Sequence, residues 1–82
     1  MNKTLKIGDI IKNHRINYNY TQKEVSKIIG MDYSNYSKIE RNLISPSLFI
    51  LSELCVLLNI DPIILLGLSR NGNQIIKQKD AD

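Results

Sequence analysis

The sequence is poor in the residues that crosslink small proteins or bind metals. Its 82 residues include one cysteine, one histidine and no tryptophan. A single cysteine excludes an internal disulfide, and no cysteine lies at ligand-like spacing to the histidine, so we expect no metal and no other cofactor. No apolar stretch approaches about 20 residues, and residues 1–11 show no signal-peptide pattern. These absences predict a cytoplasmic protein without a membrane span.

The sequence also lacks the patterns that mark catalytic sites. It contains no Gly-rich phosphate loop, no pair of carboxylates with a plausible shared pocket, and no Cys-His or Ser-His arrangement. A chain of this length supports one small domain and leaves little room for a deep pocket. Cys55 lies in an apolar run and is expected to be a small buried hydrophobe, whereas His14 is expected to be packed or partly exposed. We therefore do not expect an enzyme.

Positive charge is concentrated in the first half of the chain. The net charge is +3, and residues 1–41 hold eight of the eleven Lys and Arg residues against four acids. Residues 42–69 hold no Lys or Arg and two acids, Glu53 and Asp61. A basic half suits a polyanionic partner, although on a small domain such an excess is often only a solvated face.

Apolar residues recur every three to four positions along most of the chain, which predicts an all-α fold of five helices. The first helix is expected to begin near Thr4, as its N-cap, and to end before Asn19. Asparagine is suited to that end because it tolerates the left-handed backbone that closes a helix. The expected inward side of this helix consists of Ile7, Ile10, Ile11 and His14.

The second helix has the clearest start in the chain. Thr21 is a favourable N-cap and Glu24 follows three positions later, which is the pattern of a capping box. Gly30 is expected to end this helix, and Asp32 is expected to cap the next one. The predicted buried stripe of the second helix consists of Val25, Ile28 and Ile29.

The third helix follows after a turn of only three residues, and such short spacing predicts a sharp crossing. At 100° per residue, Tyr36 and Ile39 face inwards. The opposite side carries polar residues that include mediocre helix formers, which indicates a role other than helix stability. This outward side consists of Tyr33, Ser34, Ser37, Lys38 and Arg41. The layout predicts a helix-turn-helix whose last helix enters a DNA major groove.

A fourth helix is expected over residues 46–58, after Asn42 closes the third, and its nearly continuous apolar surface predicts a core helix. A fifth helix is expected over residues 62–66, ended by Gly67. Because the fifth helix is apolar on every side in so small a domain, we expect it to pack against a second copy. The expected dimer interface consists of Ile60, Ile63, Ile64, Leu66 and Leu68.

Together these residues resemble the phage-repressor-like, or Xre-type, helix-turn-helix family over residues 5–66. The matching segments are Ile7-Gly8, Ile11 to Arg15, Thr21-Gln22, Val25-Ser26, Gly30, Ser37 to Arg41 and Pro46-Ser47-Leu48. The chain departs from the family at Tyr36, where an aliphatic residue is usual. The resemblance implies a compact five-helix, repressor-like DNA-binding domain, which we place at residues 1–68. A polar tail at 69–82 is expected to be either disordered or a short dimer-supporting helix.

The resemblance also implies roles for individual residues. Contacts to DNA bases are expected from Tyr33, Ser34, Ser37 and Lys38. Contacts to the DNA backbone are expected from Gln22, Asn35, Arg41, Asn42 and Ser45. Arg15 and Glu40 are expected to form an ion pair between the first and third helices, which would hold the DNA-reading helix at its working angle.

Two functions from different classes are consistent with these residues. The resemblance implies a sequence-specific transcriptional regulator, a repressor by default, that binds double-stranded DNA as a homodimer on a near-palindromic operator. The alternative is a protein-interaction module, such as an antitoxin or adapter, that uses the apolar fifth helix and the tail to bind an unknown protein partner. The third helix favours the regulator, because an adapter has no use for outward Ser, Tyr and Lys side chains there.

Overall fold

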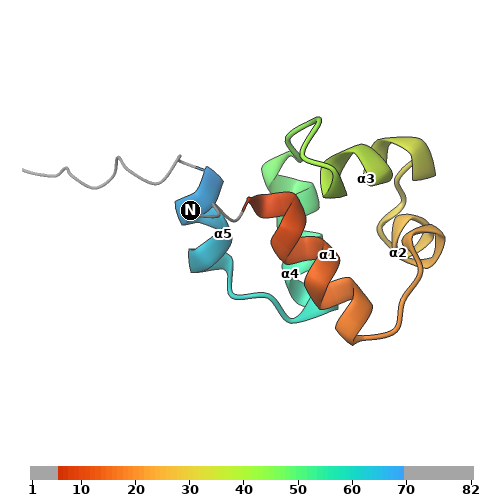
Figure 1. The fold of residues 1–82 in the computed structure, drawn as a ribbon, viewed down its shortest axis with the longest axis horizontal. Coiled ribbons are helices and arrows are strands. Elements are labelled where there is room, and N and C mark those ends of the chain that lie inside the picture. Colours follow the sequence, from red (N-terminus) through yellow and green to blue (C-terminus); the bar gives the residue numbers. More distant parts are fainter. Residues whose placement is uncertain (1–5, 70–82) are drawn as a thin grey trace, which may run out of the picture.

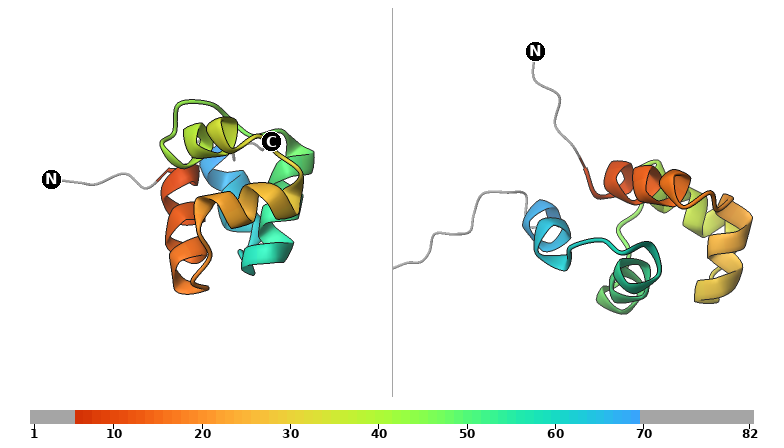
Figure 2. Two further views of the ribbon diagram at one scale, coloured as in Figure 1. Left: turned by 90° about the vertical axis from the view of Figure 1, so that its right-hand side faces the viewer. Right: turned by 90° about the horizontal axis from the view of Figure 1, so that it is seen from below.

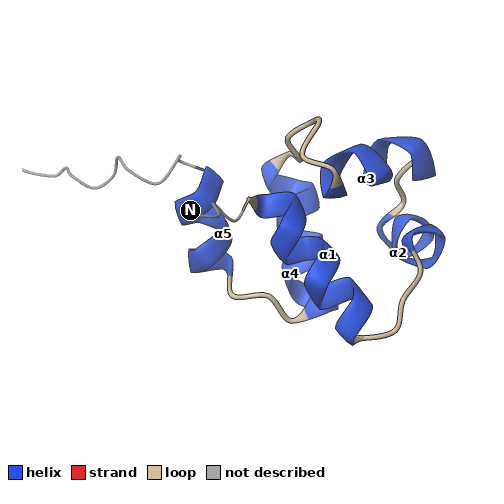
Figure 3. Ribbon diagram, in the orientation of Figure 1, coloured by secondary structure: helices blue, strands red, loops and turns tan. Residues whose placement is uncertain are grey.

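Five α-helices and no strand make up residues 6–69, which are the residues that this computed structural model describes (Figures 1 and 3). The helices are α1 (Ile7–Asn17), α2 (Gln22–Ile29), α3 (Tyr33–Glu40), α4 (Leu48–Leu58) and α5 (Pro62–Ser69). The prediction of an all-α, five-helix fold is confirmed. The expected cap at Thr4, nearly all of the tail, and the side chains of Leu66 and Leu68 lie outside the described part.

Helix α1 is central to the arrangement, because it packs against α3, α4 and α5, while α2 packs against α3 and α4. Figure 1 shows α1 in front of α4, with α2 and α3 at one end of this pair and α5 at the other. Figure 1 shows α2 nearly end-on and α3 from the side, so the two helices cross steeply, as expected for the short turn between them. The left panel of Figure 2 shows α3 along one edge of the molecule, where a long partner can reach it.

Local capping begins and ends the helices of the helix-turn-helix as the sequence predicts. The Thr21 hydroxyl accepts the Glu24 N–H at 3.0 Å, and the Glu24 carboxylate accepts the Thr21 N–H at 2.7 Å. At the start of α3 the Asp32 carboxylate accepts the Asn35 N–H at 3.3 Å. Gly30 ends α2 with a φ of 71°, a conformation that glycine adopts without a steric penalty.

Asparagine closes α1, α3 and α4. Asn19 and Asn42 have φ values of 62° and 63°, which confirms both predictions, and Asn59 closes α4 in the same way with a φ of 52°. The end of α5 differs from the prediction, since the helix continues through Gly67 to Ser69. Glycine inside a helix costs only about 1 kcal/mol, so it does not by itself end one.

Two helix starts also differ from the prediction. Helix α1 begins at Ile7 rather than near residue 4. Lys6 is the N-cap of this helix, and its backbone N–H donates to the Asp9 carboxylate at 3.0 Å. Helix α4 begins two residues later than expected, because Ser47 is its N-cap and accepts the Ile50 N–H at 3.1 Å. Serine can accept this hydrogen bond through its side chain, whereas the preceding proline cannot.

Apolar side chains from all five helices form one core. The buried apolar residues are Ile11, Val25, Ile29, Tyr36, Ile39, Leu51, Leu54, Leu58, Ile60 and Leu65. Cys55 is only partly buried. His14 is also partly buried, and its Nδ1 lies 3.1 Å from the carbonyl oxygen of Leu58.

Several burial assignments from the sequence are wrong. Ile60, expected at a dimer interface, belongs to the core and leaves too little surface for a partner. Ile28, expected in the buried stripe of α2, is more than half exposed. Helix α4 is expected to be a core helix, yet Leu48, Phe49 and Val56 are exposed. Helical periodicity identifies apolar sides correctly in these cases, but it does not tell which of them another helix covers.

Gly8 lies where α1 crosses the end of α3. A Cβ atom at this position would lie less than 3.0 Å from the backbone carbonyl oxygens of Ile39 and Glu40. The Gly8 N–H donates to the Asn42 side-chain oxygen at 2.8 Å, and the Asn42 amide donates to Asp9 at 3.3 Å. The loop after α3 therefore caps the first turn of α1, which fixes α3 against α1.

We predict that Gly8→Ala lowers the free energy of unfolding by about 1–3 kcal/mol, because the added methyl group overpacks the crossing of two backbones. Urea denaturation measures this change. Asn13→Ala, an exposed substitution on the same helix, is the control and should shift stability by less than about 0.5 kcal/mol. Equal stability of the Gly8→Ala variant and the unaltered protein would contradict the close approach of α1 and α3.

Candidate nucleic-acid interface

The outward side of α3 is uncovered by the rest of the described chain. Tyr36 and Ile39 are buried beneath it, as predicted. The exposed side chains are Tyr33, Ser34, Asn35 and Arg41, and the half-buried ones are Ser37 and Lys38. All four residues expected to contact bases therefore retain solvent-accessible surface on one helix. Their hydroxyl, phenol and ammonium groups are suited to hydrogen bonding with base edges in a major groove.

The residues expected to contact the DNA backbone lie on both sides of this surface. Gln22 is half-buried at the start of α2, whereas Asn42 and Ser45 are exposed in the loop that follows α3. The Arg41 guanidinium donates weakly to the Ser37 carbonyl oxygen at 3.4 Å, which keeps its charge close to the helix. Because Asn42 also bonds the first turn of α1, it has a structural role that the sequence did not predict.

A cation–π contact joins the two helices of the motif on the same surface. The Lys23 ammonium on α2 lies 5.7 Å from the centre of the Tyr33 ring on α3. At an exposed site such a contact contributes about 0.5–1 kcal/mol. It places the positive charge of Lys23 beside the exposed Tyr33 ring.

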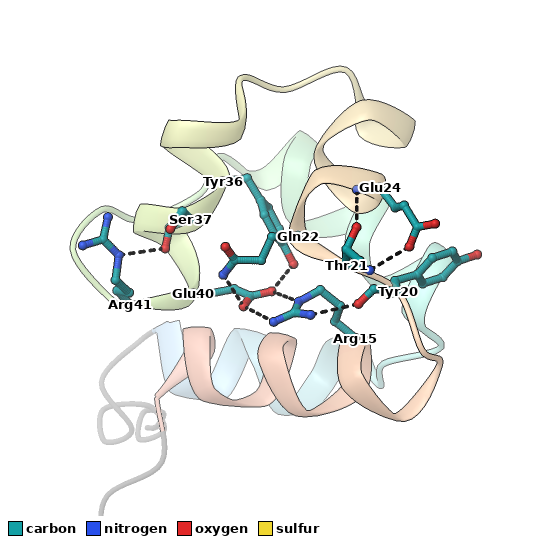
Figure 4. A network of polar contacts seen from close by, with 9 residues as sticks. All are labelled: Arg15, Tyr20, Thr21, Gln22, Glu24, Tyr36, Ser37, Glu40 and Arg41. Atoms are coloured by element: carbon teal, nitrogen blue, oxygen red, sulfur yellow. Dashed lines mark hydrogen bonds and ion pairs between the residues drawn. The ribbon is translucent and has the colours of Figure 1, made fainter.

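A buried carboxylate holds the surface in place from below (Figure 4). Glu40 on α3 has a side chain that is 1% exposed, and it forms a bidentate ion pair with Arg15 on α1 at 2.6 and 2.9 Å. Gln22 on α2 donates its amide N–H to the same carboxylate at 2.9 Å, and the Tyr36 hydroxyl donates to it as well. Arg15 also donates to the Tyr20 carbonyl oxygen at 2.8 Å. One carboxylate thus joins the two helices of the motif, α2 and α3, to α1.

The surroundings of Glu40 keep it ionised. Burial would raise the pKa of the carboxyl, but the hydrogen bonds from Arg15, Tyr36 and Gln22 outweigh burial and hold the pKa below its ordinary value of 4.5. Burial, followed by the hydrogen bond to Glu40 and then by the Glu40 charge, raises the pKa of the Tyr36 hydroxyl well above its ordinary value. Tyr36 therefore remains protonated and continues to donate. A buried charge with this many donors tolerates its loss of solvent.

The ion pair of Arg15 and Glu40 has the partners that the sequence analysis expects. The hydroxyl of Tyr36 is missed as a member of the same network. The resemblance implies that Gln22 braces the third helix, but Glu40 was not named as its partner. A signal for Tyr36 was present, because Tyr36 and Glu40 are four residues apart and hence neighbours on one helix. No comparable signal exists for Gln22, which is 18 residues away from Glu40 along the chain.

The described residues do not form a metal site, since no group of three or more His, Cys, Asp or Glu side chains in that part of the chain could hold a metal ion. None of the helices there is both long enough and apolar enough to cross a membrane.

The steep α2–α3 crossing, the uncovered polar side of α3 and the network beneath it define a helix-turn-helix domain. A family profile described as helix-turn-helix matches residues 11–65, which is more than half of the chain. The chain belongs to this family, which confirms the resemblance to the Xre-type proteins, and it is a DNA-binding regulator of that type. Searches of curated proteins and of solved structures gave no significant match.

The hydrogen bond from Tyr36 to Glu40 should affect how the free energy of unfolding depends on pH. Because Glu40 has a lowered pKa in the folded protein, its contribution to stability is present above pH 4.5, its ordinary value, and is lost as the pH falls through the lowered pKa. Tyr36→Phe removes one of the donors that lower this pKa, so stability should be lost at a higher pH. At neutral pH the variant should lose about 1.5–3 kcal/mol, the typical contribution of a hydrogen bond to a charged group.

Urea unfolding of this variant between pH 3 and pH 7 tests the prediction. Tyr20→Phe is the matched control, because Tyr20 packs against the same core, but its backbone oxygen rather than its hydroxyl bonds Arg15. The control should lose stability over the same acidic pH range as the unaltered protein. If Tyr36→Phe loses stability at the same pH as the unaltered protein, the hydroxyl does not lower the pKa of Glu40.

Proposed function

We propose that this protein is a sequence-specific transcriptional regulator, a repressor by default, that binds a near-palindromic operator as a homodimer. Helix α3 enters the major groove, where Tyr33, Ser34, Ser37 and Lys38 contact base edges. Repression is the simplest mechanism, because occupation of a promoter by this domain excludes polymerase without any additional surface.

The observation that carries this proposal is the pairing of an uncovered polar side of α3 with a buried network that fixes it. Ser34 near the start of α3 is exposed, while Glu40 at the end of the same helix is buried with its partners. Exposed polar side chains alone are common on surface helices. A buried charged network that orients the same helix is costly to build, and this cost is consistent with a need for fixed geometry.

Gln22 is proposed to contact a DNA phosphate while it braces α3. One N–H of its amide donates to Glu40 at 2.9 Å, and this hydrogen bond holds the amide group at the start of α2. The second N–H and the nearby helix N-terminus can both donate to a phosphate oxygen. Contacts from Asn35, Arg41, Asn42 and Ser45 would then fix the register of α3 along the duplex.

The homodimer is proposed from the apolar start of α5, where Ile63 and Ile64 are exposed. Ile60 is excluded from this interface by its burial, and Leu66 and Leu68 stay proposals because their side chains are not described. Two copies related by a two-fold axis would present their α3 helices to successive major grooves about 34 Å apart.

Salt dependence tests whether phosphate neutralisation drives binding. Affinity for random duplex DNA, measured by fluorescence anisotropy, should fall steadily as the salt concentration rises from about 50 to 200 mM. Each phosphate contact made by a Lys or Arg contributes to the slope, so Arg41→Ala should make the slope shallower. Binding that is absent, or that is insensitive to salt, would contradict the proposed function.

Ser34→Ala and Tyr33→Ala test base reading. Each should reduce the preference for a selected operator over random DNA by about 1–3 kcal/mol and leave non-specific affinity nearly unchanged. Tyr18→Ala is the matched control for Tyr33→Ala, because Tyr18, which directly follows α1, is 47% exposed and Tyr33 is 45% exposed. The control should retain full specificity. A uniform loss of affinity on all sequences would instead assign Tyr33 and Ser34 to the DNA backbone.

A further inference from the structure

Helix α4 has an apolar side that no other described helix covers. Leu48, Phe49 and Val56 on this side are 71%, 66% and 84% exposed. The Ser52 hydroxyl between them donates to the Phe49 carbonyl oxygen at 2.7 Å, so its hydrogen bond is made within the helix. Glu53 is the only charged residue of α4. A helix that is apolar nearly all round is normally buried on every side.

A hollow adjoins these side chains between α4 and α5. It has a volume of about 70 Å³ and is lined by Leu48, Leu51, Ser52, Cys55, Pro62 and Leu65. This volume equals that of roughly two water molecules in the liquid, which is enough for part of one aliphatic side chain. The uncovered side of α4 therefore carries both protruding apolar side chains and a depression that can receive one. We call this surface the α4 face and define it as Leu48, Phe49, Ser52, Val56 and the hollow.

We infer that the α4 face is the centre of the dimer interface, where it packs against the α4 face of a second copy. This inference rests on the homodimer of the proposed function and locates its contact surface. A two-fold interface is made by the same patch on both subunits, so that patch must be complementary to itself. The α4 face meets this condition, since a protruding Val56 or Phe49 of each copy can enter the hollow of the other.

The chemistry of the face disfavours other occupants. The segment from residue 42 to residue 69 has two acids and no Lys or Arg, so this side would repel phosphates of nucleic acids and anionic lipid headgroups. A second copy is favoured by area as well. A stable interface buries about 800 Å² on each partner, which Ile63 and Ile64 alone cannot supply. Leu48, Phe49 and Val56 add three large apolar side chains that are each at least 66% exposed.

The position of the face is compatible with DNA binding. In the right panel of Figure 2, α4 lies on the opposite side of the molecule from α1, and its outer side points away from the other helices. Helix α3 packs against α1 and α2. Association through the α4 face would therefore leave the outward side of α3 free in both copies.

Sedimentation equilibrium of the full chain tests this inference without DNA. The unaltered protein should associate to dimers. Val56→Glu should weaken association at least tenfold, because the dimer interface would bury two unpaired carboxylates, one from each copy. Val56 is 84% exposed, so the charge remains solvated in the monomer and thermal stability should be preserved. Ile28→Glu is the matched control, since Ile28 is 54% exposed on α2, and it should associate like the unaltered protein.

Alkylation of Cys55 provides a second measurement that needs no substitution. Cys55 is the only cysteine in the chain and lines the hollow, so dimerisation through the α4 face should shield its thiol. The rate of maleimide labelling at one fixed pH should fall several-fold as protein concentration rises through the range of association. In the Val56→Glu variant the rate should stay high throughout.

Unchanged association of Val56→Glu, or a labelling rate independent of concentration while dimers form, would overturn the inference. A protein that stays monomeric at all concentrations would overturn it together with the proposed homodimer. DNA binding would still be tested separately by the salt titration with duplex DNA. A protein that dimerises through this face but binds no duplex would refute the proposed function and leave the interface in place.

Discussion

The fold of the DNA-binding motif depends on one buried carboxylate. Glu40 accepts hydrogen bonds from Arg15 of α1, Gln22 of α2 and Tyr36 of its own helix, so three helices share a single charge. A charge removed from water is destabilising unless all of its acceptor positions are used. This requirement restricts the α1, α2 and α3 arrangement to geometries in which every donor reaches the carboxylate. The outward side of α3 is oriented as a consequence.

Apart from the Arg15–Glu40 ion pair, which the family resemblance implied, the features that the sequence predicted correctly are those that neighbouring residues determine. The capping box of Thr21 and Glu24, the left-handed Asn19 and Asn42, and the turn at Gly30 each depend on residues within one helical turn. Local preferences and apolar spacing agree over this region, so the five helices and their order follow from the sequence alone. The exposed side of α3 followed from the same periodicity.

Most of the features that were missed depend on contacts between distant segments, although the Tyr36–Glu40 hydrogen bond, between residues four apart, was missed as well. Asn42 and Gly8 are 34 residues apart, and nothing in the local sequence indicates that this asparagine caps α1. The burial of Ile60 and the exposure of Ile28 and Val56 were also mispredicted, because periodicity shows which side of a helix is apolar and not which side is covered. In α4, whose residues are almost all apolar, this ambiguity is greatest. Its uncovered side is an apolar surface that the DNA-binding motif does not explain.

The central claim is that the structure holds α3 as a rigid reader of DNA sequence. Selection of bound duplexes from a random DNA pool tests it most directly, because one experiment reports binding, sequence preference and symmetry together. The account predicts enrichment of a near-palindrome whose half-sites are centred about 10 base pairs apart. Recovery of sequences with no shared pattern, from a protein shown to be folded, would contradict it.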